Sequence, residues 1–140
     1  VREKHDAYAR DKVNTCRLFH GTSCSDKCNF FNKREGKPCA SRDCSICSIC
    51  THGFWLKGNV GRTAAASNMG LRYGKGIYLS KVSGKANDYA AGSEKVDNGM
   101  KWRCMLVATV AVGRAHRTQE GQLPASMCPP AGCDAVVGEV

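Results

Sequence analysis

Cysteines are the most concentrated group of chemically reactive residues in this chain. The 140 residues include ten cysteines, and seven of them fall between positions 16 and 50: Cys16, Cys24, Cys28, Cys39, Cys44, Cys47 and Cys50. A disulfide-stapled secreted domain spreads its pairs to join distant segments, whereas a metal site concentrates its ligands. The uneven placement therefore favours a local metal-binding device over a disulfide framework.

The spacing of these cysteines suits a zinc ion. Two residues separate the thiols of Cys44-Ser45-Ile46-Cys47, and the start of a predicted helix at this point also favours thiolates. Cys39 precedes the pair by five residues, and either Cys28 or Cys24 can complete a tetrahedral set of four thiolates. Such a zinc would be structural, because four thiolates leave no open coordination position. Free thiols or disulfides are the alternative.

A second set of residues lies in three short motifs that are further apart in the sequence. His20-Gly21-Thr22 ends a short apolar run, Tyr73 to Ser80 reads YGKGIYLS, and Lys85 to Tyr89 reads KANDY. Tyr78 and Tyr89 are eleven positions apart. Each motif is common by itself. In this order and spacing, over roughly residues 16 to 138, they resemble the ADP-ribosyltransferases of the poly(ADP-ribose) polymerase (PARP) type.

The resemblance implies an enzyme that cleaves the bond between nicotinamide and ribose in NAD and transfers ADP-ribose to an acceptor. Because the transition state is oxocarbenium-like, the protein must hold the leaving amide, orient the ribose and stabilise positive charge. By resemblance, His20 and Tyr78 are the catalytic residues, His20 bonding the ribose while the backbone of Gly21 binds the carboxamide. Tyr78 and Tyr89 would sandwich the nicotinamide ring, with stacking worth about 1 kcal/mol per pair.

Glycines complete this expected pocket, since Gly74 and Gly76 would keep the wall beside the nicotinamide ring free of side chains. Each of the other residues also has a purely structural interpretation. His20 can be a strand-end histidine with satisfied hydrogen bonds, and Tyr78 a strand residue with its hydroxyl at the surface. Tyr89 can be a helix residue that packs on the core. Only the three motifs together favour the binding site.

Two features depart from the family pattern. Where the family commonly has a serine that bonds the nicotinamide amide, three residues before the second tyrosine, this chain has Ala86. That contact is missing or comes from another residue, such as Ser83. The family's third signature residue, often a glutamate, is expected beyond Val140, and Glu139 lies in the approach to it. The sequence therefore does not decide whether the enzyme transfers single ADP-ribose units or builds polymers. It also does not decide whether the isolated chain is active.

The resemblance also narrows the choice of metal ligands. Plant and fungal members of the family carry a cysteine-containing insertion at this point, with a cysteine at the position of Cys28. The predicted zinc ligands are therefore Cys28, Cys39, Cys44 and Cys47. They lie in a cysteine-rich insertion over residues 23–50, where zinc would rigidify the chain after His20 and hold one rim of the NAD cleft. Cys50, which continues the apolar series of the predicted helix, is expected in the core.

The elements that must position these residues form an α+β fold, by resemblance a split mixed sheet with the NAD cleft between its halves. Apolar periodicity predicts a helix over residues 45–53 and another that begins at a capping Ser83 and closes at Gly92. The predicted strands are 16–20, 77–80, 102–112 and a piece that starts at 135. The near-continuous apolar run 102–112 predicts burial on both faces in the centre of the sheet, and residues 113–134 are expected to form a loop.

Composition sets the broad class of protein. A length of 140 residues with 42% hydrophobic residues suits one domain over residues 1–140. Because the chain opens with Val1 instead of Met, we expect a processed piece of a longer protein. The 21 Lys+Arg and 12 Asp+Glu give a net charge of +9, which favours polyanionic partners such as the NAD pyrophosphate or a nucleic acid. No stretch approaches the ~20 apolar residues of a membrane span, and the charged opening run is unlike a secretory signal.

The alternative function is a non-catalytic module that binds NAD, ADP-ribose or nucleic acid on the same fold. An enzyme would release nicotinamide from NAD, whereas a binding module would hold the ligand without turnover. Nucleic-acid binding would weaken steeply with salt. The sequence does not decide the acceptor, which is a protein or a nucleic acid, or the oligomeric state. It leaves localisation open as well, although bound zinc would slightly favour an intracellular site.

Overall fold

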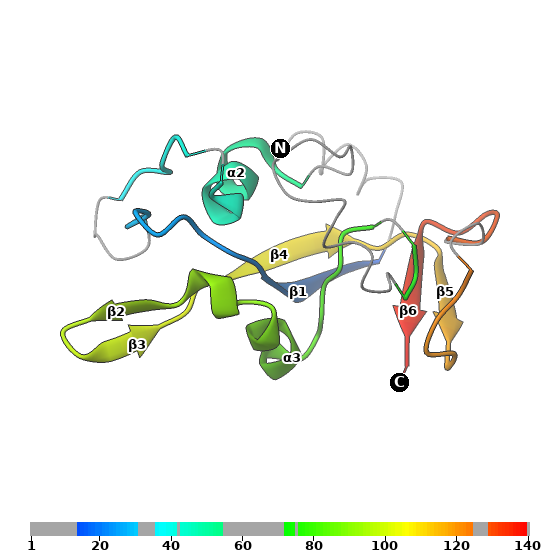
Figure 1. Cartoon of the computed structure of the whole chain (residues 1–140). Helices are drawn as coiled ribbons and strands as arrows, with labels where there is room; N and C mark the ends of the chain where they lie inside the picture. The colour runs from blue at the N-terminus through cyan, green and yellow to red at the C-terminus, as the bar shows by residue number, and fades with distance from the viewer. Residues whose placement is uncertain are drawn as a thin grey trace. The chain divides into compact units, whose positions relative to one another are not determined.

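The computed structural model describes residues 14–30, 36–41, 43–54, 72–74, 76–124 and 129–139 (Figure 1). The chain divides into two compact units. The first unit comprises Val1–Cys16, Thr63–Ile77 and Thr109–Val140, and the second unit comprises Arg17–Arg62 and Tyr78–Ala108. The predicted single domain over residues 1–140, with an insertion at 23–50, stays a prediction.

The longest strands, β1 (Thr15–Gly21) and β4 (Met105–Ala111), are hydrogen-bonded neighbours in a two-stranded sheet. The predicted strand at 16–20 is thus confirmed, but the single strand predicted over 102–112 is wrong. Residues 103 and 104 separate β4 from a shorter strand, and Val107 is 60% exposed. Exposed and half-buried positions alternate in the middle of β4, which is the period of a strand with one covered face.

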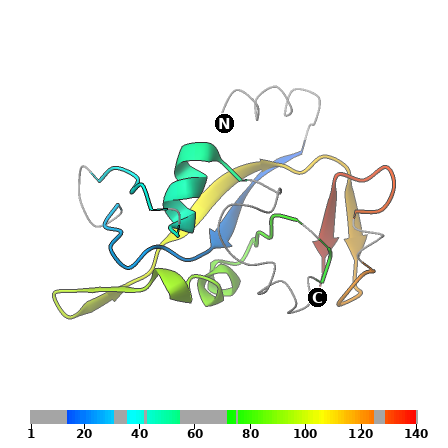
Figure 2. The same ribbon diagram turned by 45° about the horizontal axis from the view of Figure 1, so that its top comes forward.

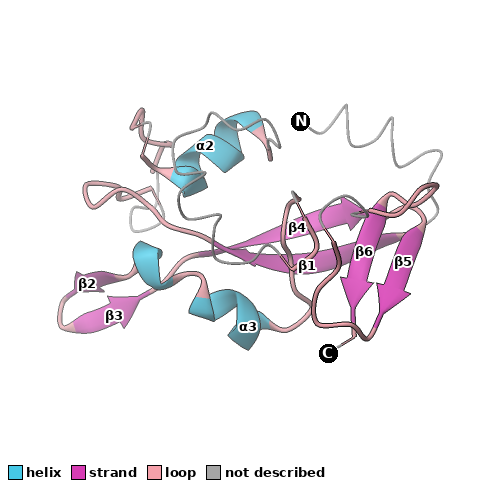
Figure 3. Cartoon of the chain, turned by 45° about the vertical axis from the view of Figure 1, so that its right-hand side comes forward, coloured by secondary structure: helices cyan, strands magenta, loops and turns pink. Residues whose placement is uncertain are grey.

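Helix α2 (Ser45–His52) confirms the helix predicted over 45–53. Cys44 is its N-cap and Gly53 its C-cap, and Ile46 and Cys47 are its buried residues. Helix α3 (Ser83–Asp88) begins where it was predicted. The two helices lie on opposite sides of the pair formed by β1 and β4 (Figures 1 and 3).

The ends of α3 differ from the prediction. Val82 is the N-cap, and no side chain caps this end, so the capping role expected for Ser83 is wrong. The helix stops at its C-cap Tyr89, whose N–H donates to the Ala86 carbonyl, while the Ala90 N–H donates to the Asn87 carbonyl in a tightened last turn. Gly92 does not close it but lies inside a separate 3-10 turn, η2 (Ala91–Ser93).

Sequence patterning did not predict the hairpin formed by β2 (Lys95–Asp97) and β3 (Met100–Trp102), which are antiparallel. Asn98 and Gly99 connect them with φ values of 47° and 75°. Positive φ at both central residues is typical of a type I′ turn, for which Asn-Gly is the preferred pair. The sequence signal was therefore present in two residues of the turn, whereas each strand is only three residues long.

The first unit contains a parallel pair, β5 (Ala115–Thr118) and β6 (Ala135–Gly138). The strand predicted from 135 onward is confirmed, whereas the loop predicted over 113–134 is wrong at β5. Arg114 links the two segments just before β5 and β6 begin. Its N–H donates to the Asp134 carboxylate at 2.8 Å and its carbonyl accepts the Asp134 N–H at 2.8 Å. These contacts align two segments whose pairing is too distant in sequence to show as a local pattern.

The sheets and helices together give a mixed α and β fold, with three two-stranded sheets among the described residues. The split mixed sheet and the NAD cleft stay predictions. The core of the second unit is rich in sulfur, since Cys24, Cys28, Cys44, Ile46 and Cys47 form its buried cluster. Within the described ranges no helix has the length and apolar character that crossing a bilayer demands.

Candidate metal centre and nicotinamide site

The four predicted metal ligands come together in the second unit. The Sγ atoms of Cys28, Cys39, Cys44 and Cys47 all lie within 4.8 Å of one another. Three of these side chains are buried and the fourth, Cys39, is half-buried. In a tetrahedral zinc site with Zn–S bonds of about 2.3 Å, neighbouring sulfurs are about 3.8 Å apart. The Cys28 and Cys47 sulfurs are 3.5 Å apart, so the donor set and its spacing fit a metal ion.

Local backbone structure places each of these sulfurs. Cys44 is the N-cap of α2 and Cys47 lies in its first turn, so the two-residue spacing brings their side chains to the same end of the helix. The Cys39 N–H donates to the Cys47 sulfur at 3.2 Å. Cys28 closes a turn by donating its N–H to the Ser25 carbonyl at 2.9 Å. Amide-to-sulfur bonds of this kind stabilise negative charge on a ligand sulfur.

A lysine from the hairpin holds the turn that carries Cys28. The Nζ atom of Lys95 donates to the carbonyl oxygens of Ser25 and Asp26 at 2.8 and 2.5 Å. Both acceptors are backbone groups, so the contact depends on the path of the turn and not on its side chains. Lys95 was not singled out in the sequence, where it is one of many basic residues.

Burial and hydrogen bonds act differently on the pKa values of the three buried thiols of this group. Burial raises the pKa of Cys28 and of Cys47. Burial acts in the same direction on Cys44, but hydrogen bonds from the backbone of Ser25 and Cys47, together with neighbouring thiols, lower its pKa to about 7. Among these three buried thiols, Cys44 is therefore the one whose surroundings favour the thiolate. A divalent cation would offset the further charges that the buried thiols resist.

The remaining cysteines of this region have other environments. The Cys24 thiol lies 3.9 Å from the Ser93 carbonyl and is outside the four-sulfur group, so Cys28 and not Cys24 completes the set. Cys50 is exposed, which corrects its expected place in the core. It lies in the last turn of α2. None of the described cysteines is in a disulfide.

His20 lies at the end of β1 in the same unit. Its Nδ1 atom is 2.8 Å from the Tyr78 carbonyl oxygen. Because a carbonyl can only accept, Nδ1 carries the proton and Nε2 is the atom that can accept a further hydrogen bond. The backbones of Phe19 and Ser80 exchange two hydrogen bonds of 2.8 and 2.9 Å, which hold the two segments side by side.

Gly21 has a close neighbour that explains its residue type. A Cβ atom at position 21 would lie 1.8 Å from the Ala86 carbonyl oxygen and 2.9 Å from the Ala90 nitrogen. The end of β1 therefore runs against the backbone of α3, and only glycine permits this approach. Ala86, at the position where the resemblance led us to expect a serine, is 3% exposed. Ser83, the other candidate for that contact, is exposed at the start of α3.

The two tyrosines are exposed. Tyr78 is 41% exposed and Tyr89 is 71% exposed, so the interpretation of Tyr89 as a core residue does not hold. Tyr78 comes two residues before the bridge at Ser80, and Tyr89 caps the C-terminus of α3. The glycines of the predicted pocket wall belong to the first unit, where a Cβ atom on Gly76 would meet nothing within 4 Å.

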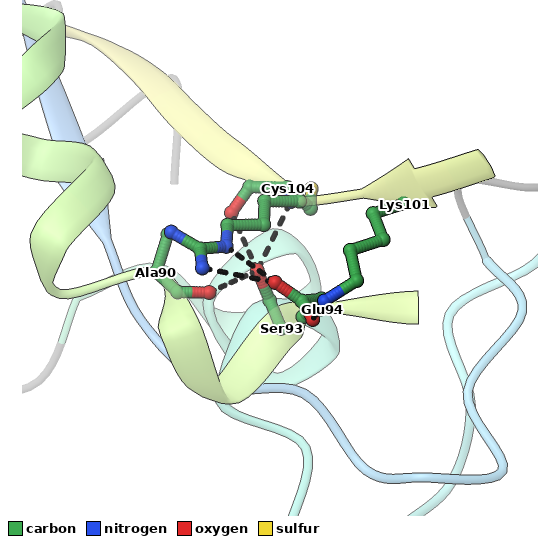
Figure 4. A network of polar contacts seen from close by, with 6 residues as sticks. Ala90, Ser93, Glu94, Lys101 and Cys104 are labelled. Carbon is green, nitrogen blue, oxygen red and sulfur yellow. Dashed lines mark hydrogen bonds and ion pairs between the residues drawn. The ribbon is translucent and has the colours of Figure 1, made fainter. Parts of the chain in front are cut away.

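A buried hydroxyl joins η2 to the segment between β3 and β4 (Figure 4). Ser93 is fully buried, and its Oγ lies 2.7 Å from the Ala90 carbonyl and 3.1 Å from the Cys104 carbonyl. It also accepts the Cys104 N–H at 3.0 Å. Beside it, the Glu94 carboxylate pairs with Lys101 at 3.2 Å and with Arg103 at 2.9 Å. Sequence patterning missed Ser93, because one serine after a glycine carries no local signal of burial.

Comparison with known proteins identifies the family. The family model described as the poly(ADP-ribose) polymerase catalytic domain matches residues 39–139, more than two thirds of the chain. The matched range includes Tyr78 and Tyr89 but begins after His20 and Gly21. A search of curated proteins gave no match. On the strength of that range, the chain belongs to the poly(ADP-ribose) polymerase catalytic-domain family, whose members are ADP-ribosyltransferases.

Proposed function

We propose that this chain binds NAD through His20, Gly21, Tyr78 and Tyr89 and cleaves its nicotinamide–ribose bond to transfer ADP-ribose. One observation carries the proposal: the 2.8 Å contact between His20 Nδ1 and the Tyr78 carbonyl. It joins two of the three motifs that sequence order alone suggested. It also leaves His20 Nε2 as an acceptor, and Tyr78 is 41% exposed.

The proposed roles follow from the chemistry of each group. The Nε2 atom of His20 would accept a hydrogen bond from a ribose hydroxyl, because its partner nitrogen is already committed as a donor. The backbone of Gly21 would bind the carboxamide. The exposed rings of Tyr78 and Tyr89 would stack on the nicotinamide. Ala86 offers no hydroxyl, so stacking would supply a larger share of the binding than in a site with a serine there.

The four-cysteine cluster has a structural role in this proposal. Cys28, Cys39, Cys44 and Cys47 would hold one zinc ion, which offsets thiolate charge and links the turn at residue 28 to the start of α2. A full set of four thiolates excludes a catalytic role for the ion. The proposal leaves open whether the acceptor is a protein or a nucleic acid. The net charge of +9 suits a polyanionic acceptor such as a nucleic acid.

The test measures nicotinamide release from NAD together with NAD binding by calorimetry. We expect both in the parent chain, and we expect Tyr78→Ala and His20→Ala to lower them without loss of fold. Val107→Ala is the matched control, since this side chain is exposed on β4. Binding without release would favour the non-catalytic module. Absence of both in the folded, zinc-loaded protein would refute the proposed function.

A further inference from the structure

The imidazole of His20 has a second neighbour that neither its motif nor its family match identifies. The ring centroids of His20 and Phe54 are 5.0 Å apart, and the ring planes meet at 87°. This is an edge-to-face contact, the preferred geometry of aromatic pairs. It is the only ring pair among the described residues. The Tyr78 carbonyl and the Phe54 ring therefore hold the imidazole from two directions.

The position of Phe54 depends on the way α2 ends. Gly53, its C-cap, donates its N–H to the Ile49 carbonyl at 2.8 Å and has φ 81° and ψ −175°. This combination lies in a region of backbone conformation that is essentially limited to glycine. The glycine sets the direction in which the chain leaves the helix, and so the place where the next ring lies.

The other end of α2 is tied to the chain that follows His20. The Ile46 N–H donates to the Ser23 carbonyl at 3.3 Å, and Cys44 and Cys47 belong to the sulfur cluster. Figure 2 shows α2 beside the segment that leaves β1. Only two residues separate His20 from Ser23. The contacts thus form a closed path from His20 along the chain to Ser23, through α2 to Phe54, and back to the imidazole.

We infer that Phe54 is a positioning residue for His20, and that α2, anchored by the cysteine cluster, presents it. In catalytic terms the inference depends on the proposed function, because His20 would use its Nε2 atom on the ribose. The carbonyl of Tyr78 selects the protonated nitrogen, and the ring of Phe54 restricts rotation of the imidazole. A metal ion in the cluster would influence the ribose-binding side chain through this helix, without contact between the two sites.

The inference is tested on the ligand-free, zinc-loaded protein by NMR of the His20 ring. We expect ¹⁵N shifts of an Nδ1-protonated imidazole and ring-current shifts of its carbon-bound protons. Phe54→Leu should remove the ring-current shifts and mix the two tautomers, whereas Phe54→Tyr should restore both signals. Phe30→Leu is the matched control, since Phe30 packs against the same sulfur cluster in the same unit.

Two further experiments distinguish failure of the positioning role of Phe54 from failure of the proposed function. With NAD, Phe54→Leu should raise KM by about tenfold with a smaller change in kcat, because His20 would hold the ribose in the bound substrate as well as in the transition state. Gly53→Ala should reproduce the NMR change with both rings retained, and it replaces Phe54→Leu if that variant does not fold. Unchanged His20 signals in these variants would overturn the role of Phe54. Signals that do not respond to a chelator would overturn its link to the cluster. Absence of NAD turnover in the parent chain would refute only the proposed function.

Discussion

Tyr89 is the residue whose surroundings are hardest to explain by packing alone. A large aromatic ring that is 71% exposed at the end of a short helix gives up most of the stabilisation that burial would provide. Two residues near it in sequence behave differently, since Ala86 and Ala90 are buried against the end of β1. An exposed ring beside a closely packed backbone is suited to stack on a flat ligand.

Substitution of Tyr89 tests this role directly. Tyr89→Phe should keep most of the affinity for a nicotinamide-like inhibitor, because the π-face survives and only a hydroxyl is lost. Tyr89→Ala should weaken binding by roughly 1–3 kcal/mol, or about ten- to a hundredfold. Calorimetric titration of the two variants gives the comparison. Equal affinity of Tyr89→Ala and the parent chain would rule out the stacked arrangement.

Among the elements, η2 is connected to the segment between β3 and β4 through one buried side chain, Ser93. Ser93→Ala should lower the free energy of unfolding by about 1–3 kcal/mol, because it leaves the Cys104 N–H without its buried acceptor. Chemical denaturation measures the change. Ser83→Ala is the control, since Ser83 is exposed and makes no capping bond, and its effect should stay within about 0.5 kcal/mol. Similar values for the two variants would contradict the role of Ser93.

The hairpin should respond to acid through Glu94. Hydrogen bonds from Arg103 and then Lys101 lower the pKa of this carboxyl below its ordinary value of 4.5. When the pKa of a carboxyl group is lower in the folded than in the unfolded state, its ionised form stabilises the fold. This contribution is complete above the pKa of the unfolded state and disappears as pH falls through the pKa of the folded state. Thermal melts should therefore show a smaller effect of Glu94→Gln below pH 4.5 than at pH 7. An equal effect at both pH values, or no sensitivity to salt, would contradict the ion pairs.

The helices and strands also show which features of the fold can be predicted from local sequence patterns. Helix α2 and the grouping of Cys39, Cys44 and Cys47 were predicted from spacing within about one turn or one loop, whereas the choice of Cys28 over Cys24 came from the family resemblance. The near-continuous apolar sequence of β4 does not reveal that the side chain of Val107 is exposed to solvent. A strand with one covered face and a strand with two covered faces can have the same apolar sequence. The contact of Phe54 with His20 depends on the chain path after Gly53. No local pattern records a meeting of residues that are 34 positions apart.

For the whole molecule, stability should depend on metal. Purified protein should contain about one equivalent of zinc, and a chelator should lower Tm, because metal-binding free energy is folding free energy. Free zinc at a thousand times Kd contributes about 4 kcal/mol, which corresponds to a Tm change of roughly 10 °C. Cys47→Ser should abolish the effect, whereas the exposed Cys50 should tolerate serine. A zinc content near zero, or an unchanged Tm with chelator, would count against the site.

Hydrogen exchange of the Cys104 amide, which donates to the Ser93 hydroxyl, can report how often the second unit opens. Its acceptor is fully buried, and Cys104 packs against the sulfur cluster. This amide proton can therefore exchange with solvent deuterium only when η2 separates from the chain between β3 and β4. Its exchange rate would show whether the hairpin opens together with the cysteine-rich core or independently of it, in a protein that carries no substitution.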